Sequence, residues 1–199
     1  MSAKRYDRAY FDRWYRNPRT RMWPRSAVAR KIRMVLGFAE QLLERPVRSV
    51  LDVGCGEGAW QPILARLRPG LRYVGVDSSP YAVGRFGRRR HIRHGEFGTL
   101  HALRLPRRFD LVVCCDVLHY VPTQELIPGL ATLHRLARGP AYLEAYTGGD
   151  DVEGDDHEFR RRSAGTYRRL FREAGFTSCG MHCYVTRAMA GVLLALERS

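Results

Sequence analysis

The sequence lacks any apolar run of 18 residues, so no segment is expected to cross a membrane. Its arginine-rich N-terminus contains no apolar segment and predicts no secretory signal. It has only five cysteines, all in predicted strands or in a glycine-rich turn, which favours reduced thiols and a cytoplasmic location. No repeat or low-complexity linker divides the 199 residues, of which 45% are hydrophobic. We therefore expect one domain spanning residues 1–199.

Lysine is almost absent. Lys4 and Lys31 are the only lysines, so arginine carries nearly all of the positive charge behind the formal net charge of +14. Residues 1–50 hold 13 basic and 4 acidic side chains. A basic excess of this size is typical of proteins that bind nucleic acid, but a bias of arginine over lysine also follows from genome composition. A solvated surface and an anionic partner both remain open.

The most informative pattern is an apolar run that ends in alternating glycines. Val50–Val53 contains one carboxylate, Asp52, and is followed by Gly54, Gly56 and Gly58. This pattern predicts a buried strand that turns sharply into a helix. Glycine permits positive φ and has no Cβ, so the backbone of such a turn can lie flat against a ligand.

A second apolar run, Tyr73–Asp77, also ends in a carboxylate. Asp77 follows the glycine turn by about 20 residues, the spacing at which a carboxylate accepts ribose hydroxyls. NAD-binding proteins share this arrangement, but Asp52 would repel their pyrophosphate. A ligand with an ammonium group, a ribose, an adenine and no phosphate suits these residues better, and S-adenosylmethionine has those parts.

At these residues the chain resembles the class I S-adenosylmethionine-dependent methyltransferases, whose first motif reads acid-hydrophobic-Gly-x-Gly-x-Gly. The resemblance extends to Phe109–His119, which is similar to the family's fourth motif. It implies a Rossmann-like, doubly wound, mostly parallel seven-stranded sheet with an antiparallel C-terminal hairpin, formed by Thr177–Val185 and Met189–Glu197. The residues expected to bind the cofactor are Tyr15, Asp52, Gly54, Cys55, Gly56, Gly58, Asp77, Ser78, Glu96, Phe97 and Cys115.

The end of the fourth strand is expected to face the transferring methyl group and the acceptor. His119 is a candidate general base because imidazole titrates near neutral pH; the alternative is a structural histidine that packs on the following helix. The expected acceptor-binding residues are Asp116, His119, Tyr120, Glu144 and Tyr146. For Glu144, a carboxylate paired at the edge of the sheet is the alternative.

In residues 1–45 aromatic residues alternate with charged ones, and a resemblance to the same family implies that this region is a helical lid. Tyr10 and Trp14, with Phe11 beside them, share a helical face, and Phe11–Tyr15 resembles the Tyr-Asp-x-x-Tyr segment with which many small-molecule methyltransferases begin. In those enzymes the N-terminal helix closes over the cofactor, which implies that Tyr15 faces the sulfonium. Plain packing of the aromatic stripe on the domain is the alternative.

Residues 147–162 form a variable, acidic, glycine-rich loop with three possible roles: a solvated loop, a flap for a cationic substrate, or a metal site. The carboxylates of Asp150–Asp156 lack the spacing of a calcium loop. Cys179, His182 and Cys183 do not supply four tetrahedral zinc ligands. We therefore expect no metal.

The resulting prediction is an S-adenosylmethionine-dependent methyltransferase that acts on an N, O or S atom of a small molecule and releases S-adenosylhomocysteine. The sequence contains neither an Asn/Asp-Pro-Pro-Tyr motif nor a Pro-Cys dipeptide, the motifs that would indicate methylation of nucleic-acid bases. An RNA methyltransferase, an inactive cofactor-binding regulatory protein and, more distantly, an NAD oxidoreductase are the alternatives. The sequence does not determine the oligomeric state.

Overall fold

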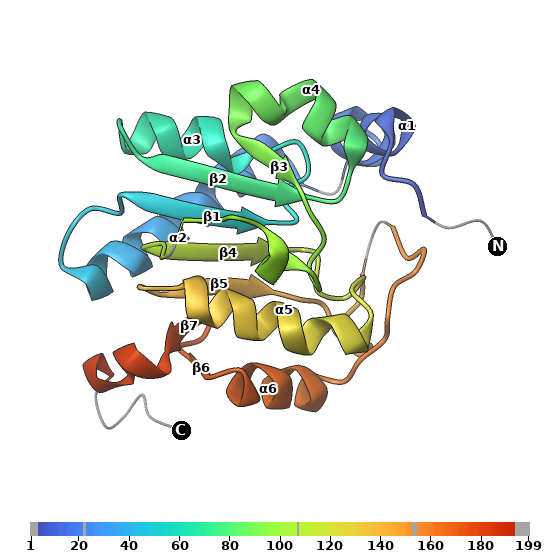
Figure 1. Cartoon of the computed structure of the whole chain (residues 1–199). Helices are drawn as coiled ribbons and strands as arrows, with labels where there is room; N and C mark the ends of the chain where they lie inside the picture. The colour runs from blue at the N-terminus through green and yellow to red at the C-terminus, as the bar shows by residue number, and fades with distance from the viewer. Residues whose placement is uncertain (1–3, 22, 107, 153–154, 194–199) are drawn as a thin grey trace.

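One sheet of seven strands runs through the chain in the order β3-β2-β1-β4-β5-β7-β6 (Figure 1). The computed structural model describes residues 4–21, 23–106, 108–152 and 155–193. Strands β1 to β5 pair in parallel, whereas β7 runs antiparallel to β5 and β6. The strands are β1 (Ser49–Val53), β2 (Arg72–Asp77), β3 (Ile92–His94), β4 (Leu111–Cys115), β5 (Ala141–Glu144), β6 (Phe176–Ser178) and β7 (Cys183–Thr186).

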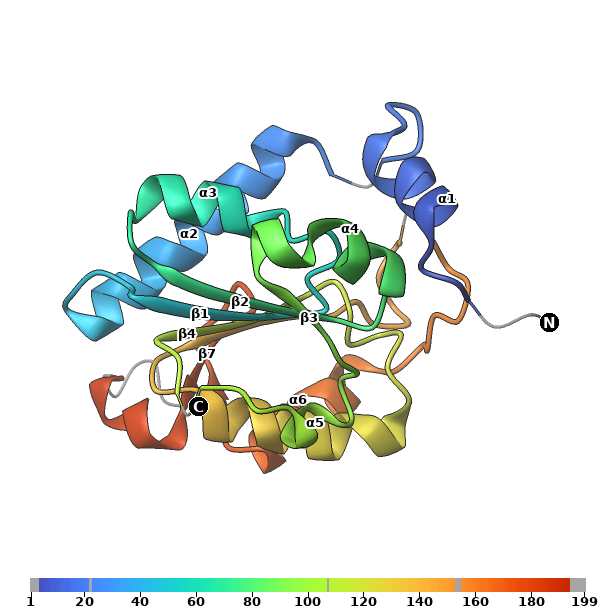
Figure 2. The same cartoon turned by 45° about the horizontal axis from the view of Figure 1, so that its top comes forward.

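Helices cover both faces of this sheet. In Figure 2, α2, α3 and α4 lie on one face and α5 and α6 on the other. The α-helices are α1 (Arg8–Phe11), α2 (Arg25–Leu43), α3 (Trp60–Leu67), α4 (Pro80–Arg90), α5 (Thr123–Leu136) and α6 (Ala164–Glu173). A π-helical turn η1 (Asp12–Arg16) and two 3-10 turns, η2 (Leu100–Ala102) and η3 (Arg187–Val192), complete the described elements.

Each face of the sheet has its own apolar core, because successive strand residues point to opposite faces. Val50 of β1 packs in the cluster that contains Ile32 of α2 and Leu64 of α3. The next residue, Leu51, belongs to the cluster that contains Leu126 of α5. All five residues of β1 are buried, and Asp52 is the one carboxylate among them.

The direction of the strand order reverses between β1 and β4, which pair with each other. The chain leaves these two strands towards opposite faces, and this opens a crevice at their carboxyl ends. The doubly wound, mostly parallel sheet predicted from the sequence is confirmed, as is the antiparallel C-terminal hairpin. The ends of β1, β2 and β4 all meet at this crevice.

The position of that hairpin differs from the prediction. Thr177–Val185 was expected to be one strand, but it is divided between β6 and β7 by a turn in which Gly180 has φ 82°. A second strand was expected over Met189–Glu197, but Arg187–Val192 is a 3-10 turn. Residues 194–197 lie outside the described part of the chain. Gly180 gives the physical reason, because its left-handed backbone reverses the chain earlier than the apolar pattern suggested.

The N-terminal aromatic residues also deviate from one regular helix. After the single turn of α1 the backbone widens into the π-helical turn η1. Phe11 becomes buried, with 1% of its surface exposed, and its ring lies 5.1 Å from the ring of Tyr15. The wider turn brings these two residues onto one side of the segment.

Candidate active site

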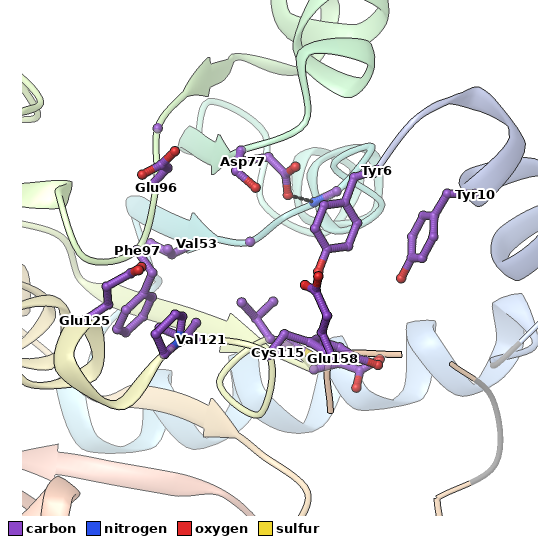
Figure 3. Close-up of a pocket in the computed structure, with 18 of the residues that line it drawn as sticks. Tyr6, Tyr10, Val53, Asp77, Glu96, Phe97, Cys115, Val121, Glu125 and Glu158 are labelled. Atoms are coloured by element: carbon purple, nitrogen blue, oxygen red, sulfur yellow. Dashed lines mark hydrogen bonds between the residues drawn. The ribbon is translucent and has the colours of Figure 1, made fainter. Parts of the chain in front are cut away.

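Two adjoining cavities open at the crevice between β1 and β4. The larger, of about 320 Å³, is lined by the ends of β1, β2 and β4 and by the N-terminal segment (Figure 3). The smaller, of about 120 Å³, lies towards α2 and α3. We call them the main cavity and the side cavity. Both are lined by Tyr15, Gly54, Cys115 and Asp116, so a ligand can extend from one into the other.

The glycine turn between β1 and α3 forms the floor where the two cavities meet. The amides of Gly54 and Cys55 donate hydrogen bonds to the carbonyl of Val76, at 2.8 and 3.2 Å, and hold the turn against β2. Gly54 has φ 71°, and a Cβ built on it would lie 2.3 Å from Cγ2 of Val117. Any side chain here would collide with the segment after β4, so the turn requires glycine.

Of the other predicted residues of the turn, Gly56 lines the main cavity and Cys55 the side cavity. Gly58 is not among the lining residues. A Cβ on Gly58 would lie 3.1 Å from Ile92 and 3.4 Å from Arg90, so this glycine allows close packing against the α4–β3 region.

Asp77 lies at the end of β2 and lines the main cavity. Its Oδ2 accepts a hydrogen bond from the amide of Gly56 at 2.6 Å, and its Oδ1 accepts one from the amide of Ser79 at 2.9 Å. Burial raises the pKa of Asp77, although these two hydrogen bonds act to lower it. Each carboxylate oxygen can accept a second hydrogen bond, so Asp77 can receive two hydroxyl donors from a ligand. The neighbouring Ser78 also lines the cavity.

Asp52 and Lys31 supply opposite charges to the side cavity. Asp52 is 2% exposed and accepts a hydrogen bond from the hydroxyl of Tyr73 at 2.6 Å. Burial raises the pKa of Asp52 to about 7, against the opposing effect of the Tyr73 hydrogen bond. A carboxylate and an ammonium on the walls of one small cavity match a ligand end that carries both charges, such as a free amino-acid group.

Glu96 and Phe97 follow β3 and line the opposite end of the main cavity. Figure 3 shows them beside Glu125 and Val121, across the cavity from Tyr10. Phe97 also packs into the core, because a Cβ on Gly129 of α5 would lie 2.1 Å from its ring. An exposed carboxylate next to a fixed aromatic ring gives this end both a polar and a flat apolar surface.

Cys115 and Asp116 lie at the end of β4, at the boundary of the two cavities. Asp116 has φ 62°, an uncommon conformation for a residue with a side chain. Burial and the nearby Glu144 carboxylate raise the pKa of Asp116 to about 7. Asp116 is therefore a carboxylate that lines both cavities and titrates near neutral pH.

His119 lies behind this wall rather than in it. Its side chain is completely buried and packs against the rings of Tyr120, Tyr146 and Phe159. Its Nε2 lies 3.4 Å from Oδ1 of Asp116, and its Nδ1 accepts a hydrogen bond from the amide of Tyr146. Burial lowers the pKa of His119 to about 4, and the nearby Lys4 charge acts in the same direction. The histidine can thus act on a ligand only through Asp116.

The remaining acceptor-side candidates divide into two groups. Tyr120 lines the main cavity, and its hydroxyl donates to the carbonyl of Asp155 at 2.6 Å. Glu144 is 5% exposed and lines neither cavity; its carboxylate is 2.7 Å from the ammonium of Lys31. Tyr146 is half-buried beside His119 and is also not among the residues that line the two cavities. Only Asp116 and Tyr120 of this predicted set reach the main cavity.

The N-terminal segment forms one wall of the main cavity. Tyr6, Tyr10, Phe11 and Tyr15 all contribute to its lining. The hydroxyl of Ser79 at the start of α4 donates to the carbonyl of Tyr6 and fixes the segment to the domain. A Cβ on Gly56 would lie 3.4 Å from the hydroxyl oxygen of Tyr15, so the tyrosine reaches the glycine turn.

Sequence reasoning missed the residues that hold this segment in place. The ammonium of Lys4 lies 2.6 Å from Oδ2 of Asp155, and the Lys4 amide donates to Glu158 at 3.0 Å. Glu158 also lines the main cavity. The only signal in the sequence was the acidic character of residues 147–162, which does not identify a partner at the other end of the chain.

The structure also bears on the metal alternatives. Within the described part of the chain, no group of three or more His, Cys, Asp or Glu side chains is arranged to hold a metal ion. Cys183 packs in the core cluster on the α2 face of the sheet.

Among the described residues, no helix combines the length and the apolar character needed to cross a membrane.

Comparison with known proteins relates this geometry to a family. Residues 51–140 match the methyltransferase domain family. Ubiquinone biosynthesis O-methyltransferase of Azotobacter vinelandii is 28% identical over 110 residues, which cover 51% of this chain and 47% of the relative. The chain thus spans about half the length of that curated relative.

Two solved structures share the fold across most of the chain. A SAM-dependent methyltransferase from Archaeoglobus fulgidus superposes with a TM-score of 0.62 at 15% identity, covering 84% of this chain and 73% of its own. Magnesium protoporphyrin IX methyltransferase from Synechocystis PCC 6803, solved with bound SAM, gives a TM-score of 0.60 at 20% identity, covering 86% and 82%. The resemblance drawn from Asp52–Gly58, Asp77 and Phe109–His119 is thereby confirmed: residues 51–140 match the methyltransferase domain family, and the chain shares the fold of these two methyltransferases.

Proposed function

We propose that the chain is an S-adenosylmethionine-dependent methyltransferase that acts on a small-molecule acceptor. One observation carries the proposal: the glycine turn, Asp77, Glu96 and Asp116 line one cavity at the point where the strand order reverses. The match of residues 51–140 to the methyltransferase domain family supports it. S-adenosylmethionine, when bound, supplies a methyl group activated by its sulfonium, and S-adenosylhomocysteine remains after transfer.

The residues present fit the parts of this cofactor. Asp77 would accept the ribose hydroxyls, with Ser78 beside it, and Glu96 with Phe97 would contact the adenine. The side cavity would take the amino-acid end, with Asp52 facing the ammonium and Lys31 facing the carboxylate. Lys31 is an addition to the residues expected from the sequence. Lys31 already pairs with one carboxylate, that of Glu144, and the carboxylate of the cofactor would be a second partner of the same kind.

At the acceptor side, the chain would contribute position and proton handling. Alignment of two reactants in one site accounts for much of the rate of such a displacement. Asp116 and Tyr120 line the cavity where an acceptor would approach. Asp116 can take a proton from the acceptor. The buried Nε2 of His119 has no hydrogen-bond partner among the described residues and lies 3.4 Å from Oδ1 of Asp116, so a small shift would let it donate to Asp116 and orient the carboxylate. We therefore propose His119 as a positioning residue, with Glu144 and Tyr146 in support behind the wall.

Two segments would control access. We propose residues 1–45 as a lid and residues 147–162 as the loop that meets it, within a single domain. In both Figure 1 and Figure 2 the blue N-terminal segment and the orange loop lie at the same edge of the molecule. A cytoplasmic location fits the buried, free thiols of Cys114 and Cys183, which an oxidising compartment would not favour.

Photo-crosslinking with radiolabelled S-adenosylmethionine tests this proposal. The wild-type chain should be labelled, excess S-adenosylhomocysteine should suppress labelling, and NADH should not. Asp77→Asn should lower labelling by about tenfold, because a lost hydrogen bond to a charged group costs about 1.5–3 kcal/mol. Asp12→Asn, on the exposed side of the lid, is the matched control and should behave as wild type. Equal labelling of the Asp77 variant and the wild type would refute the ribose assignment.

A further inference from the structure

The wall of the main cavity is acidic, although the chain as a whole is strongly basic. Five carboxylates line it, and no lysine, arginine or histidine is among the described residues that do so. This contrasts with the formal net charge of +14. The lining carboxylates are Asp77, Glu96, Asp116, Glu125 and Glu158. A cavity of this charge attracts cations and repels anions.

The proposed cofactor accounts for only part of this acidity. Asp77 and Glu96 face its ribose and adenine. Glu125 lies at the same end, because a Cβ on Gly98 would touch its side chain at 2.7 Å. The amino-acid end of the cofactor has its own carboxylate, Asp52, in the side cavity. Asp116 and Glu158 are therefore left for a different ligand group, Glu158 through the carboxylate oxygen that does not accept the hydrogen bond of the Lys4 amide.

Tyrosine rings line the main cavity together with these two carboxylates. Tyr6, Tyr10 and Tyr120 line the same part of the cavity, and Figure 3 draws Tyr6 and Glu158 on the side away from Glu96 and Glu125. Aromatic faces and carboxylates together form the usual environment of an organic ammonium.

The chain's own lysine demonstrates that these rings accept such a group. The ammonium of Lys4 lies 3.5 Å from the ring centre of Tyr120, 5.2 Å from that of Tyr6 and 5.6 Å from that of Tyr10. Only 4% of the Lys4 side chain is exposed. Its ammonium is paired with Asp155 rather than with Asp116 or Glu158, although its charge acts to lower the pKa of Asp116 from a distance. Lys4 is not among the described residues that line the main cavity, and with Tyr10 and Asp155 it lines a separate one, so an alkylammonium is already held beside these rings from outside the main cavity.

We propose that the methyl acceptor is an amine, recognised as its ammonium ion by Glu158 and Asp116 between the rings of Tyr6, Tyr10 and Tyr120. This inference rests on the proposed methyltransferase function. The ammonium gives one proton to Asp116, the nitrogen lone pair forms the new N–C bond, and the S–C bond of the cofactor breaks. The products are the N-methylated amine, which retains a positive charge, and the neutral thioether S-adenosylhomocysteine.

Matched probes on the protein saturated with S-adenosylhomocysteine test the acceptor class. Each of two scaffolds is titrated by calorimetry as an amine, an alcohol and a carboxylic acid: phenethylamine, 2-phenylethanol and phenylacetate, then hexylamine, hexanol and hexanoate. The amine should bind at least about tenfold more tightly than its alcohol, with the acid weakest. An amine that binds no better than its alcohol on both scaffolds overturns the proposal.

Two variants locate the effect. Glu158→Gln keeps the shape of the side chain and removes its charge, so amine binding should weaken by about fivefold while alcohol binding is unchanged. Glu173→Gln, on the exposed surface of α6, is the matched control and should leave both unchanged. If the Glu158 variant and the wild type bind the amine equally well, the proposed recognition of the ammonium ion by Glu158 is refuted.

The initial titration with S-adenosylhomocysteine distinguishes a failure of the proposed acceptor class from a failure of the proposed methyltransferase function. No binding of S-adenosylhomocysteine refutes the methyltransferase assignment and the acceptor class together. Binding of S-adenosylhomocysteine without preference for amines refutes the acceptor class alone.

Discussion

The ammonium of Lys4 and the carboxylate of Asp155 form an ion pair at 2.6 Å that joins the N-terminal segment to the acidic loop. The same ammonium donates to the carbonyl of His157 at 3.1 Å. Together with the Lys4 amide bonded to Glu158, these contacts hold the N-terminal segment and the acidic loop together beside the main cavity, which both segments line. One of the two lysines in the chain therefore holds the N-terminal segment to the acidic loop.

Lys4→Gln should loosen this attachment. The variant removes a nearly buried charge from its partner, so the N-terminal segment should open more often and expose its arginines. We expect limited trypsin digestion to cut residues 5–21 at least about fivefold faster than in the wild type. Arg8→Gln, which removes an exposed pair with Asp12, is the control and should show no change apart from loss of its own cleavage site. Equal cleavage rates in the Lys4 variant and the wild type would show that the Lys4–Asp155 ion pair does not hold the N-terminal segment in place.

Asp52 should make cofactor affinity depend on pH. Its folded-state pKa is raised to about 7, so the carboxylate needed to pair with the ligand ammonium is the minor form at pH 6 and the major form at pH 8. Affinity for S-adenosylhomocysteine should therefore rise by about tenfold between these pH values. Asp52→Asn should bind weakly and lose this part of the pH dependence.

Tyr73→Phe provides the second test of the same group. Without the Tyr73 hydrogen bond, the Asp52 carboxylate loses the interaction that holds its pKa down, so the affinity curve should move to higher pH. A curve that stays in place would show that another group of the site, such as Asp116, controls the titration.

The glycines of α4 should respond differently to alanine. A Cβ on Gly84 meets nothing within 4 Å, whereas one on Gly87 would lie 3.0 Å from the backbone carbonyl of Ile92. Gly84→Ala should raise the free energy of unfolding by about 0.5–1 kcal/mol, because alanine loses less conformational entropy in a helix. Gly87→Ala should give no gain or a loss. Urea denaturation of both variants measures the difference, and an equal gain in both would contradict the packing at Gly87.

Asp110 should stabilise the fold without affecting the site. Its buried carboxylate bonds with Arg45 and Arg138, and the Arg45 and Arg138 guanidiniums hold its pKa well below the usual range despite burial. Asp110→Asn should cost about 3 kcal/mol at pH 7, measured by denaturation. Because the folded-state pKa is lowered, this contribution is present above about pH 4 and is lost as the pH falls further. A difference between variant and wild type that stays constant down to pH 2 would contradict this origin.

The sequence predicted the parts of the site that depend on local pattern. Asp52, the glycine turn and Asp77 follow from apolar strands that each end at a fixed point, so the sheet brings them together by its topology alone. The antiparallel hairpin was predicted in kind but misplaced, because Gly180 reverses the chain inside what reads as a single apolar strand.

Contacts between side chains that are distant in the sequence could not be predicted from local patterns. His119 has the chemistry of a base, but the turn after β4 directs its ring behind Asp116 and among three other rings. Glu144 has the position of a substrate ligand, but Lys31 from α2 engages it. The pairing of Lys4 with Asp155 joins distant segments, and neither residue lies in a pattern that identifies the other.

Calorimetric titration of the wild-type chain with S-adenosylmethionine, S-adenosylhomocysteine and NADH tests the central claim most directly. The geometry of Asp52, Gly54, Asp77 and Glu96 predicts binding of both adenosyl ligands in the micromolar range and none of NADH. Binding of NADH without either adenosyl ligand would contradict the assignment of the cavity and the role given to Asp52.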